Sequence, residues 1–278
     1  MNALTATGCV HARPTSAGRW MLLWPLLLAT ALWPHWRWAL ARVQDGSDDP
    51  LGLAALAVLI VAVIRQAVRG APEMRSGWQW LSVAVCVLAT LAWWRLPPLI
   101  GALLAALTLV AGLLAVLPAG MARLPLAGLA VLSLPVVSSM QFYAGYPLRA
   151  LTAQVSVWLL SALGMTTERS GAAMTVNGQL ILVDAPCSGV QMVWMAYFCA
   201  LSLALLVGRS DRFLLQRLPL VGLLVMAGNI VRNSVLVGLE ASGVTVAEWL
   251  HQGIGLAVLA AVCGGVVWLV GRGRDARV

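Results

Sequence analysis

The chain alternates long apolar runs with short polar segments, and the apolar runs have the length of membrane-spanning helices. Crossing the hydrocarbon core takes about 20 mostly apolar residues in a helix. Eight runs meet this requirement and predict transmembrane helices over residues 20–40, 51–68, 78–95, 98–117, 124–143, 188–208, 217–239 and 248–271. A ninth run, 146–164, is apolar but carries several polar side chains, and its hydropathy alone does not decide whether it spans.

The composition agrees with a polytopic membrane protein. Of the 278 residues, 61% are hydrophobic and 10% are charged, whereas soluble domains are about half apolar and a quarter charged. The net charge of +8 comes from arginine alone, because the chain has no lysine. Such a balance in a soluble protein would suggest nucleic acid. Here the arginines sit in short loops between apolar runs, which favours a topogenic role and excludes a nucleic-acid partner.

The arginines predict the sidedness of the helices. The positive-inside rule assigns arginine-rich tails and loops to the cytoplasm, and twelve of the 18 arginines fall in such segments: Arg13, Arg19, Arg65, Arg69, Arg75, Arg123, Arg209, Arg212, Arg217, Arg272, Arg274 and Arg277. Both termini are then cytoplasmic, and the chain must cross an odd number of times between Arg123 and Cys187. Residues 146–164 have the more polar face, which contains Arg149, Thr152 and Ser156, so they are predicted to form an outer interfacial helix.

Five segments follow from this topology: a cytoplasmic tail over 1–19, N-terminal transmembrane helices over 20–143, an extracytoplasmic segment over 144–186, a second set of transmembrane helices over 187–271, and a cytoplasmic tail over 272–278. Within the extracytoplasmic segment, Asn177-Gly178 is a type I′ turn signal between two short apolar stretches. The predicted fold is an all-α polytopic membrane protein with eight transmembrane helices, one outer interfacial helix and a small β-hairpin before Cys187.

One of the five cysteines stands apart from the others. No CxxC pair or His/Cys cluster occurs and the count is odd, so neither a disulfide framework nor a metal or other cofactor is predicted. Cys86, Cys199 and Cys263 fall in mid-span, where a thiol is expected to serve packing. Cys187 instead lies at a span edge, in DAPCSGVQ. Pro186 is suited to the start of the helix, which puts Cys187 in its first turn.

Three further polar residues fall on the same predicted side of the membrane as Cys187. Arg232 lies about 7 residues, or roughly 10 Å, inside the seventh span. An arginine at that depth costs several kcal/mol unless it faces the bundle interior and has a partner. Asn229 shares its helical face and is expected to bond the guanidinium or its ligand. His251 opens the last span. The loop charges alone fixed the sidedness, so the coincidence of these groups is an independent result.

These residue types suit nucleophilic acyl transfer. A thiol becomes nucleophilic as a thiolate, and a helix N-terminus and a neighbouring cation lower its pKa. Cys187 is the candidate nucleophile, His251 the general base and then acid, and Arg232 the group that stabilises an oxyanion or holds a carboxylate, worth about 3 kcal/mol of barrier. Ser188 and Gly189 would bring backbone N–H groups close to the reacting carbonyl.

Each residue also has a structural reading. A cysteine at a helix start is more often structural than catalytic. An intramembrane arginine can serve ion binding or packing, and Asn229 can simply bond a neighbouring helix. His35 lies among tryptophans in WPHWRW and is expected to be a polar residue of the membrane-interface belt.

The order of these motifs resembles the exosortase/archaeosortase family. Cys-Ser-Gly at 187–189, Asn-x-x-Arg at 229–232 and then His251 occur in or at apolar spans, after an amphipathic segment and a hairpin signal, and the resemblance covers roughly residues 145–260. It implies a membrane-embedded cysteine protease-transpeptidase. Such enzymes cleave the C-terminal sorting signal of exported proteins, which is a short motif followed by a transmembrane helix and basic residues, and pass the new carboxyl terminus to a surface acceptor.

Carried over to this chain, the resemblance implies Cys187 as nucleophile, with Arg232 and His251 as the other catalytic members. His251 favours the bacterial branch, which implies an inner-membrane protein with its active site facing the periplasm. Asp184-Ala-Pro is not the commonest lead-in to the cysteine, so the subfamily and its recognised signal stay open. Two alternatives remain at this point: a transporter or channel in which Arg232 and Asn229 line an anion path, and a non-enzymatic scaffold for polysaccharide or protein export.

Overall fold

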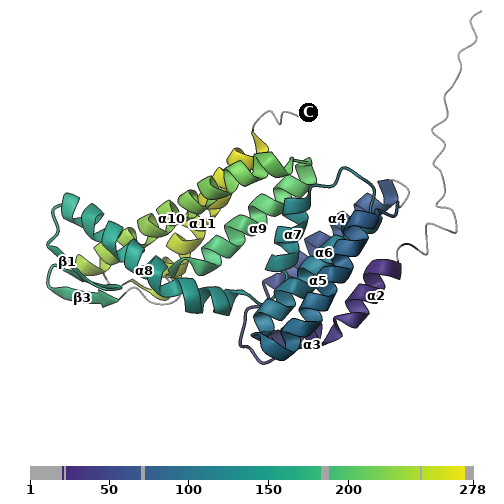
Figure 1. Ribbon diagram of the computed structural model, residues 1–278. Coiled ribbons are helices and arrows are strands. Elements are labelled where there is room, and N and C mark those ends of the chain that lie inside the picture. The colour runs from purple at the N-terminus through teal and green to yellow at the C-terminus, as the bar shows by residue number, and fades with distance from the viewer. Residues whose placement is uncertain (1–20, 22, 70–72, 183–187, 245, 273–278) are drawn as a thin grey trace, which may run out of the picture.

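The computed structural model describes residues 21, 23–69, 73–182, 188–244 and 246–272. These residues form helices and one small sheet (Figure 1). The first helices are α2 (Leu23–Ala31), α3 (Trp33–Gln44), α4 (Gly52–Arg69), α5 (Ser76–Arg95), α6 (Pro98–Val116), α7 (Arg123–Leu132) and α8 (Val137–Ala162). After them come β1 (Thr167–Ser170), β2 (Ala173–Val176), β3 (Gln179–Leu182), α9 (Val190–Val207), α10 (Asp211–Ala241) and α11 (Glu248–Gly271).

The described residues contain fewer candidate spans than the eight predicted. Six helices are long and apolar enough to cross a membrane, namely α4, α5, α6, α9, α10 and α11, and the bent pair of α7 and α8 raises the number to seven at most. The fold class, an all-α polytopic membrane protein, is confirmed. The most buried of these candidate spans is α6, with 61% of its apolar window buried. Its glycines and alanines let neighbouring backbones approach closely, as membrane helix interfaces require.

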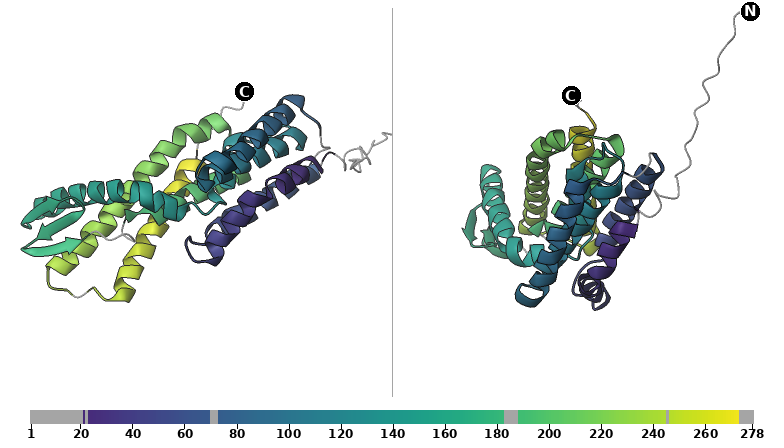
Figure 2. Two further views of the ribbon diagram at one scale, coloured as in Figure 1. Left: turned by 60° about the horizontal axis from the view of Figure 1, so that its bottom comes forward. Right: turned by 45° about the vertical axis from the view of Figure 1, so that its right-hand side comes forward.

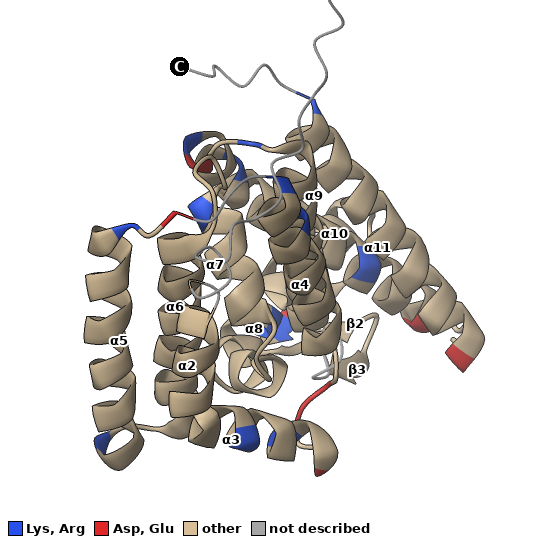
Figure 3. Ribbon diagram, turned by 90° about the vertical axis from the view of Figure 1, so that its right-hand side faces the viewer, with Lys and Arg blue, Asp and Glu red and all other residues tan. Residues whose placement is uncertain are grey.

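The predicted span 20–40 is wrong as a single helix. The chain breaks at Leu32, and α3 runs across the end of the bundle instead of continuing α2 (Figure 3). Pro34 lies in the first turn of α3 and gives the physical reason, since proline lacks the N–H that a continuous helix would need there and fits the first turn of a new one.

The predicted span 124–143 is also wrong as a straight helix. It breaks after Leu132, and α8 leaves at 95° to α7. Pro135 lies in the break and disfavours helical backbone at the residue before it. The end of that span and the predicted interfacial helix are therefore parts of one 26-residue helix, α8.

Most of the arginine-rich segments gather at one end of the bundle (Figure 3). Hydrogen bonds join the helix ends there. Arg75 donates to the carbonyl of Leu117, Asp211 accepts from the backbone N–H of Leu124 at 2.8 Å, and Arg209 donates through Nε to a carbonyl at the end of α11, 2.9 Å away. The loops that the sequence assigned to one side thus share one end of the structure, which we call the arginine-rich end.

Two of the three residues that mark the polar face of α8, Thr152 and Ser156, are buried against α10, whereas Arg149 is half-buried. Thr152 accepts a hydrogen bond from Asn229 of α10 at 3.1 Å, and Ser156 bonds Ser234 of the same helix at 3.0 Å. Figures 1 and 2 show α8 lying along the second half of α10. Burying an unpaired hydroxyl in an apolar interior costs free energy, and hydrogen bonds between α8 and α10 avoid that cost.

The small sheet packs on the end of α8. Its strands are antiparallel in the order β1-β2-β3, and the turn between β2 and β3 is Asn177-Gly178, both with positive φ (49° and 82°). These are the backbone angles of the type I′ turn that the Asn-Gly pair favours. Met174 and Val176 of β2 are fully buried in a cluster with Leu160 of α8. The sheet therefore holds the far end of α8 beside α10.

His35 is packed between helices rather than exposed at the surface. It is 2% exposed, its ring meets Trp93 edge-on at 5.3 Å, and a side chain at Gly101 would lie 2.7 Å from it. The contact joins α3 to α5 and α6. Burial lowers the pKa of His35, because an apolar environment disfavours the imidazolium form.

The loop after α3 is tied to the start of α8 through Asp48. Its carboxylate accepts from the backbone N–H of Ser138 at 3.3 Å with each oxygen and from that of Asp49 at 3.0 Å. A carboxylate at a helix N-terminus is electrostatically favourable. Burial nevertheless raises the pKa of Asp48, because this desolvation outweighs its hydrogen bonds and the nearby Arg42.

This raised pKa gives a pH-dependent prediction. A folded-state pKa above the unfolded value favours the protonated carboxyl, so its stabilisation is full at acid pH and is lost as pH rises through the folded pKa. Asp48→Asn should flatten that decline and keep the melting temperature at neutral pH. Asp48→Ala should lower the melting temperature at acid and at neutral pH, by the equivalent of about 1–3 kcal/mol, because two backbone N–H donors lose their acceptor. Melting curves in detergent test this, and an asparagine variant as unstable as alanine at neutral pH would contradict it.

Candidate active site

The structure brings together the described members of the predicted site. Ser188 and Gly189 stand at the start of α9, Asn229 and Arg232 on α10, and His251 in the first turn of α11. Cys187 lies outside the described residues. The described members come from three helices and from positions up to 63 residues apart in sequence, so only tertiary packing can unite them.

Arg232 and His251 form the centre of the site. Arg232 Nη2 lies 3.0 Å from His251 Nε2. A guanidinium can only donate, so Nε2 accepts and the neutral imidazole carries its proton on Nδ1. Arg232 is half-buried, and its Nε has no hydrogen-bond partner among the described residues. The intramembrane arginine thus has the interior partner that its depth demands.

Gly189 makes a close contact with α10 at the start of α9. Its φ is +82°, and a Cβ at this position would lie 2.8 Å from the side chain of Asn229. Both conditions exclude other residues, since the left-handed region and the close approach each penalise a side chain. Asn229 is 2% exposed. The turn that follows Cys187 in the sequence is therefore seated on α10, one helical turn from Arg232.

Two residues of α8 hold this arrangement, and neither role was predicted from the sequence. Gln141 accepts a hydrogen bond from the hydroxyl of Ser188 at 2.7 Å, and Thr152 accepts from Asn229. Asn229 was expected to bond the guanidinium or its ligand; its Oδ1, the atom that could accept from Arg232, has no hydrogen-bond partner among the described residues. The sequence signal was present for Gln141, a lone amide within the apolar stretch 124–143.

Two cavities meet at His251. One, of about 430 Å³, lies between α9, α10 and α11 and is lined by Gly189, Gln191, Arg232 and His251. The other, of about 630 Å³, lies between β3, α10 and the loop before α11, and Asn233 and Glu240 line it beside His251. The imidazole can therefore be approached from two directions.

The charges around the site suit an anionic or carbonyl-containing ligand. In the described chain no carboxylate forms an ion pair with Arg232, and Glu248 of the cavity wall accepts from Gln252 at 2.9 Å. Gly255 faces the guanidinium, and a side chain there would come within 3.3 Å of its Nε. No group of three or more acidic, histidine or cysteine residues that could bind a metal ion occurs in the described ranges.

Comparison with known protein families shows the family to which the chain belongs. A family profile described as transmembrane exosortase matches residues 19–268. The chain belongs to the transmembrane exosortase family. The match covers the N-terminal helices as well as most of α9, α10 and α11, so the resemblance inferred from residues 145–260 extends over most of this exosortase. No curated protein and no solved structure matches this exosortase.

The close packing of Gly189 against Asn229 predicts that a side chain at position 189 lowers the activity of this exosortase. Gly189→Ala should disrupt the start of α9, since the left-handed conformation costs a side chain about 1–2 kcal/mol and the added carbon meets Asn229. We expect processing of a co-expressed substrate to fall at least roughly tenfold. Gly253→Ala on α11 is the matched control, because a Cβ there meets nothing within 4 Å. Equal activity of the two variants would contradict the positioning role.

Proposed function

We propose that this exosortase is a cysteine protease-transpeptidase that cleaves the C-terminal sorting signals of exported proteins. The observation that carries the proposal is the Arg232–His251 hydrogen bond, which lies at a cavity whose wall includes Gly189. Cys187 is two residues before Gly189 and is the proposed nucleophile. Family membership supports substrates that bear sorting signals. The pairing of a base with a cation near the start of α9, the helix that follows Cys187 in the sequence, supports acyl transfer over the transporter and scaffold alternatives.

In the first half-reaction the thiol of Cys187 gives its proton to His251 and attacks the scissile carbonyl carbon. The carbonyl oxygen becomes an oxyanion, and Arg232 stabilises it with guanidinium N–H donors. As the oxyanion draws the guanidinium, Nε2 of His251 is released from Arg232 and serves as the base. Collapse of the intermediate breaks the C–N bond, His251 protonates the leaving amine, and a thioester remains on Cys187.

In the second half-reaction a nucleophile of the acceptor, or water, attacks the thioester. His251 removes its proton, the C–S bond breaks, and the thiol of Cys187 is restored. The two cavities at His251 support this sequence of events. We assign the cavity that contains Gly189 to the sorting-signal peptide, and the one beside β3 to the incoming acceptor.

The proposed location is a bacterial inner membrane, with both termini in the cytoplasm and the site facing the periplasm. It rests on the positive-inside rule and on the common end of the arginine-rich segments. The partners are exported proteins that end in a short motif, one apolar helix and basic residues, together with the surrounding lipid.

Co-expression tests the proposal. A protein from the same genome with such a C-terminus, tagged at both ends, should be cut between the two tags only when the exosortase is present. Hydroxylamine added to the membranes should release the N-terminal fragment as a hydroxamate, because it attacks thioesters. A substrate cut without any hydroxamate-forming intermediate would contradict the covalent mechanism.

A further inference from the structure

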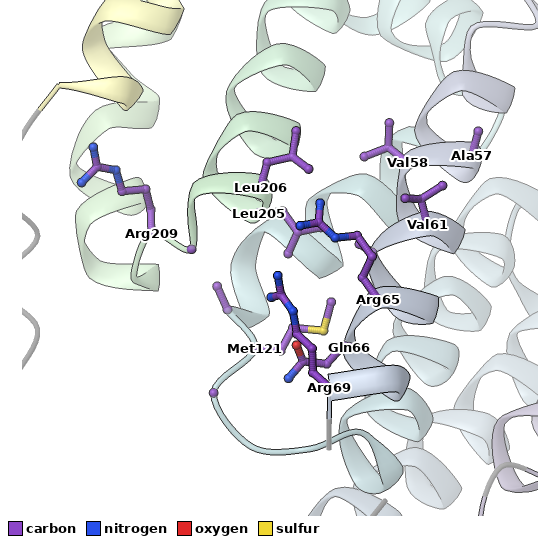
Figure 4. A pocket seen from close by; sticks show the side chains of 14 residues that line it. Ala57, Val58, Val61, Arg65, Gln66, Arg69, Met121, Leu205, Leu206 and Arg209 are labelled. Atoms are coloured by element: carbon purple, nitrogen blue, oxygen red, sulfur yellow. The ribbon is translucent and has the colours of Figure 1, made fainter. Parts of the chain in front are cut away.

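A groove lies between α4, α9 and the loop over residues 117–122, far from the candidate active site. It encloses about 320 Å³ at the arginine-rich end of the bundle. Its long walls are apolar side chains of the two helices, including Val58, Val61, Leu205 and Leu206 (Figure 4). The catalytic proposal makes no use of this groove, and α9, which forms one wall, is the helix that begins at Gly189.

Two arginines stand at the mouth of the groove. Arg65 and Arg69 are one helical turn apart on α4, and Figure 4 shows both side chains reaching across the groove toward α9 and Met121. Arg209 also lines the groove, but its guanidinium turns away to the end of α11, where its Nε donates to Val270.

The charges of Arg65 and Arg69 are not balanced by the described chain. Within the described ranges neither forms an ion pair or a hydrogen bond to another residue, since the ion pair found there joins Arg42 to Asp48. Like charges one turn apart on a helix repel one another. An anion between them would relieve that repulsion, and the neighbouring Gln66 holds the loop in place by donating to Pro118 at 3.3 Å.

We propose that this groove binds an anionic glycerophospholipid, with its phosphate on Arg65 and Arg69 and an acyl chain along the apolar walls of α4 and α9. Basic pockets between membrane helices on the cytoplasmic side suit such headgroups, and the proposed topology places the arginine-rich end on that side. From Ala57 to Arg69 the groove follows α4 for about 18 Å at helical rise, which accommodates most of an acyl chain. The lipid joins α4 to the helix that begins at the active site.

Native mass spectrometry of the purified protein with phosphatidylglycerol or phosphatidylcholine tests the site. Each arginine beside an anionic headgroup is worth about fivefold in affinity, so the double variant Arg65→Gln/Arg69→Gln should bind phosphatidylglycerol roughly 25-fold more weakly and lose the preference over phosphatidylcholine. Arg95→Gln, an exposed arginine at the opposite end of α5, is the matched control and should bind as the wild type does. Unchanged binding by the double variant would overturn the proposal.

Two further experiments identify the ligand and separate a loss of binding from a loss of folding. Inorganic phosphate in excess should not displace phosphatidylglycerol, and displacement would show that the site recognises phosphate alone. Ala57→Trp should fill the groove and weaken binding while both arginines remain. Ile64→Trp, on the same helix but outside the groove, should not. Equal binding by the two tryptophan variants would contradict the acyl-chain position.

Discussion

Replacing Cys187 with alanine is expected to abolish processing of a co-expressed substrate while the protein accumulates at its normal level. The proposed mechanism has no other nucleophile, so the rate should fall by roughly 10⁴-fold or more, below detection in cells. Cys187→Ser should be equally inactive, because a hydroxyl does not ionise as a thiol does at neutral pH. Immunoblotting of substrate and product, with the exosortase itself as loading standard, measures the effect.

Two other cysteines provide matched controls for this experiment. Cys199 and Cys263 are free thiols within α9 and α11, and their replacement by alanine removes a sulfur from the same bundle without touching the site. Both variants should process substrate normally. Processing by the Cys187→Ala protein would end the proposal of covalent catalysis.

The second large effect is expected from Arg232→Lys. Lysine keeps the positive charge, but its ammonium lacks the planar fork that can donate to His251 and to a developing oxyanion together. Loss of one such donor typically costs about 10²–10³ in rate, and we expect a decrease of that size in the initial rate of substrate cleavage. The thiol should also become less reactive, since the geometry around His251 is lost.

Arg95→Lys is the appropriate comparison for that substitution. It makes the same chemical change on an exposed side chain at the end of α5, so it should leave the rate unaltered. Size-exclusion chromatography of both variants separates a defect in chemistry from a defect in assembly. Full activity of Arg232→Lys would reduce Arg232 to a packing role.

The site residues on α10 and α11 could be predicted from the sequence because membrane physics makes them conspicuous. An arginine deep in an apolar run needs a partner, and counting loop charges put His251 on its side of the membrane. The contact between them, 3.0 Å long, agrees with that reasoning. The roles of Gln141 and Thr152 were missed because they depend on where α8 lies, which no local pattern encodes.

Helix breaks explain most of the remaining differences. Pro34 and Pro135 accompany the breaks that end α2 and α7, whereas Pro147 and Pro219 lie inside the continuous helices α8 and α10. In a membrane, neighbouring helices and polar side chains can satisfy the backbone groups that a proline leaves open. Which proline bends the chain is therefore decided by packing, and hydropathy could not distinguish the broken runs from intact spans.

The central claim is that Arg232 and His251 activate the thiol of Cys187, and its reactivity with pH tests this most directly. In a variant that keeps Cys187 as its sole cysteine, the rate of alkylation by a membrane-impermeant reagent should report a thiol pKa below that of a free cysteine. Adding His251→Ala should move the pKa upward. A thiol that titrates like free cysteine in both proteins, or that never reacts, would contradict the account.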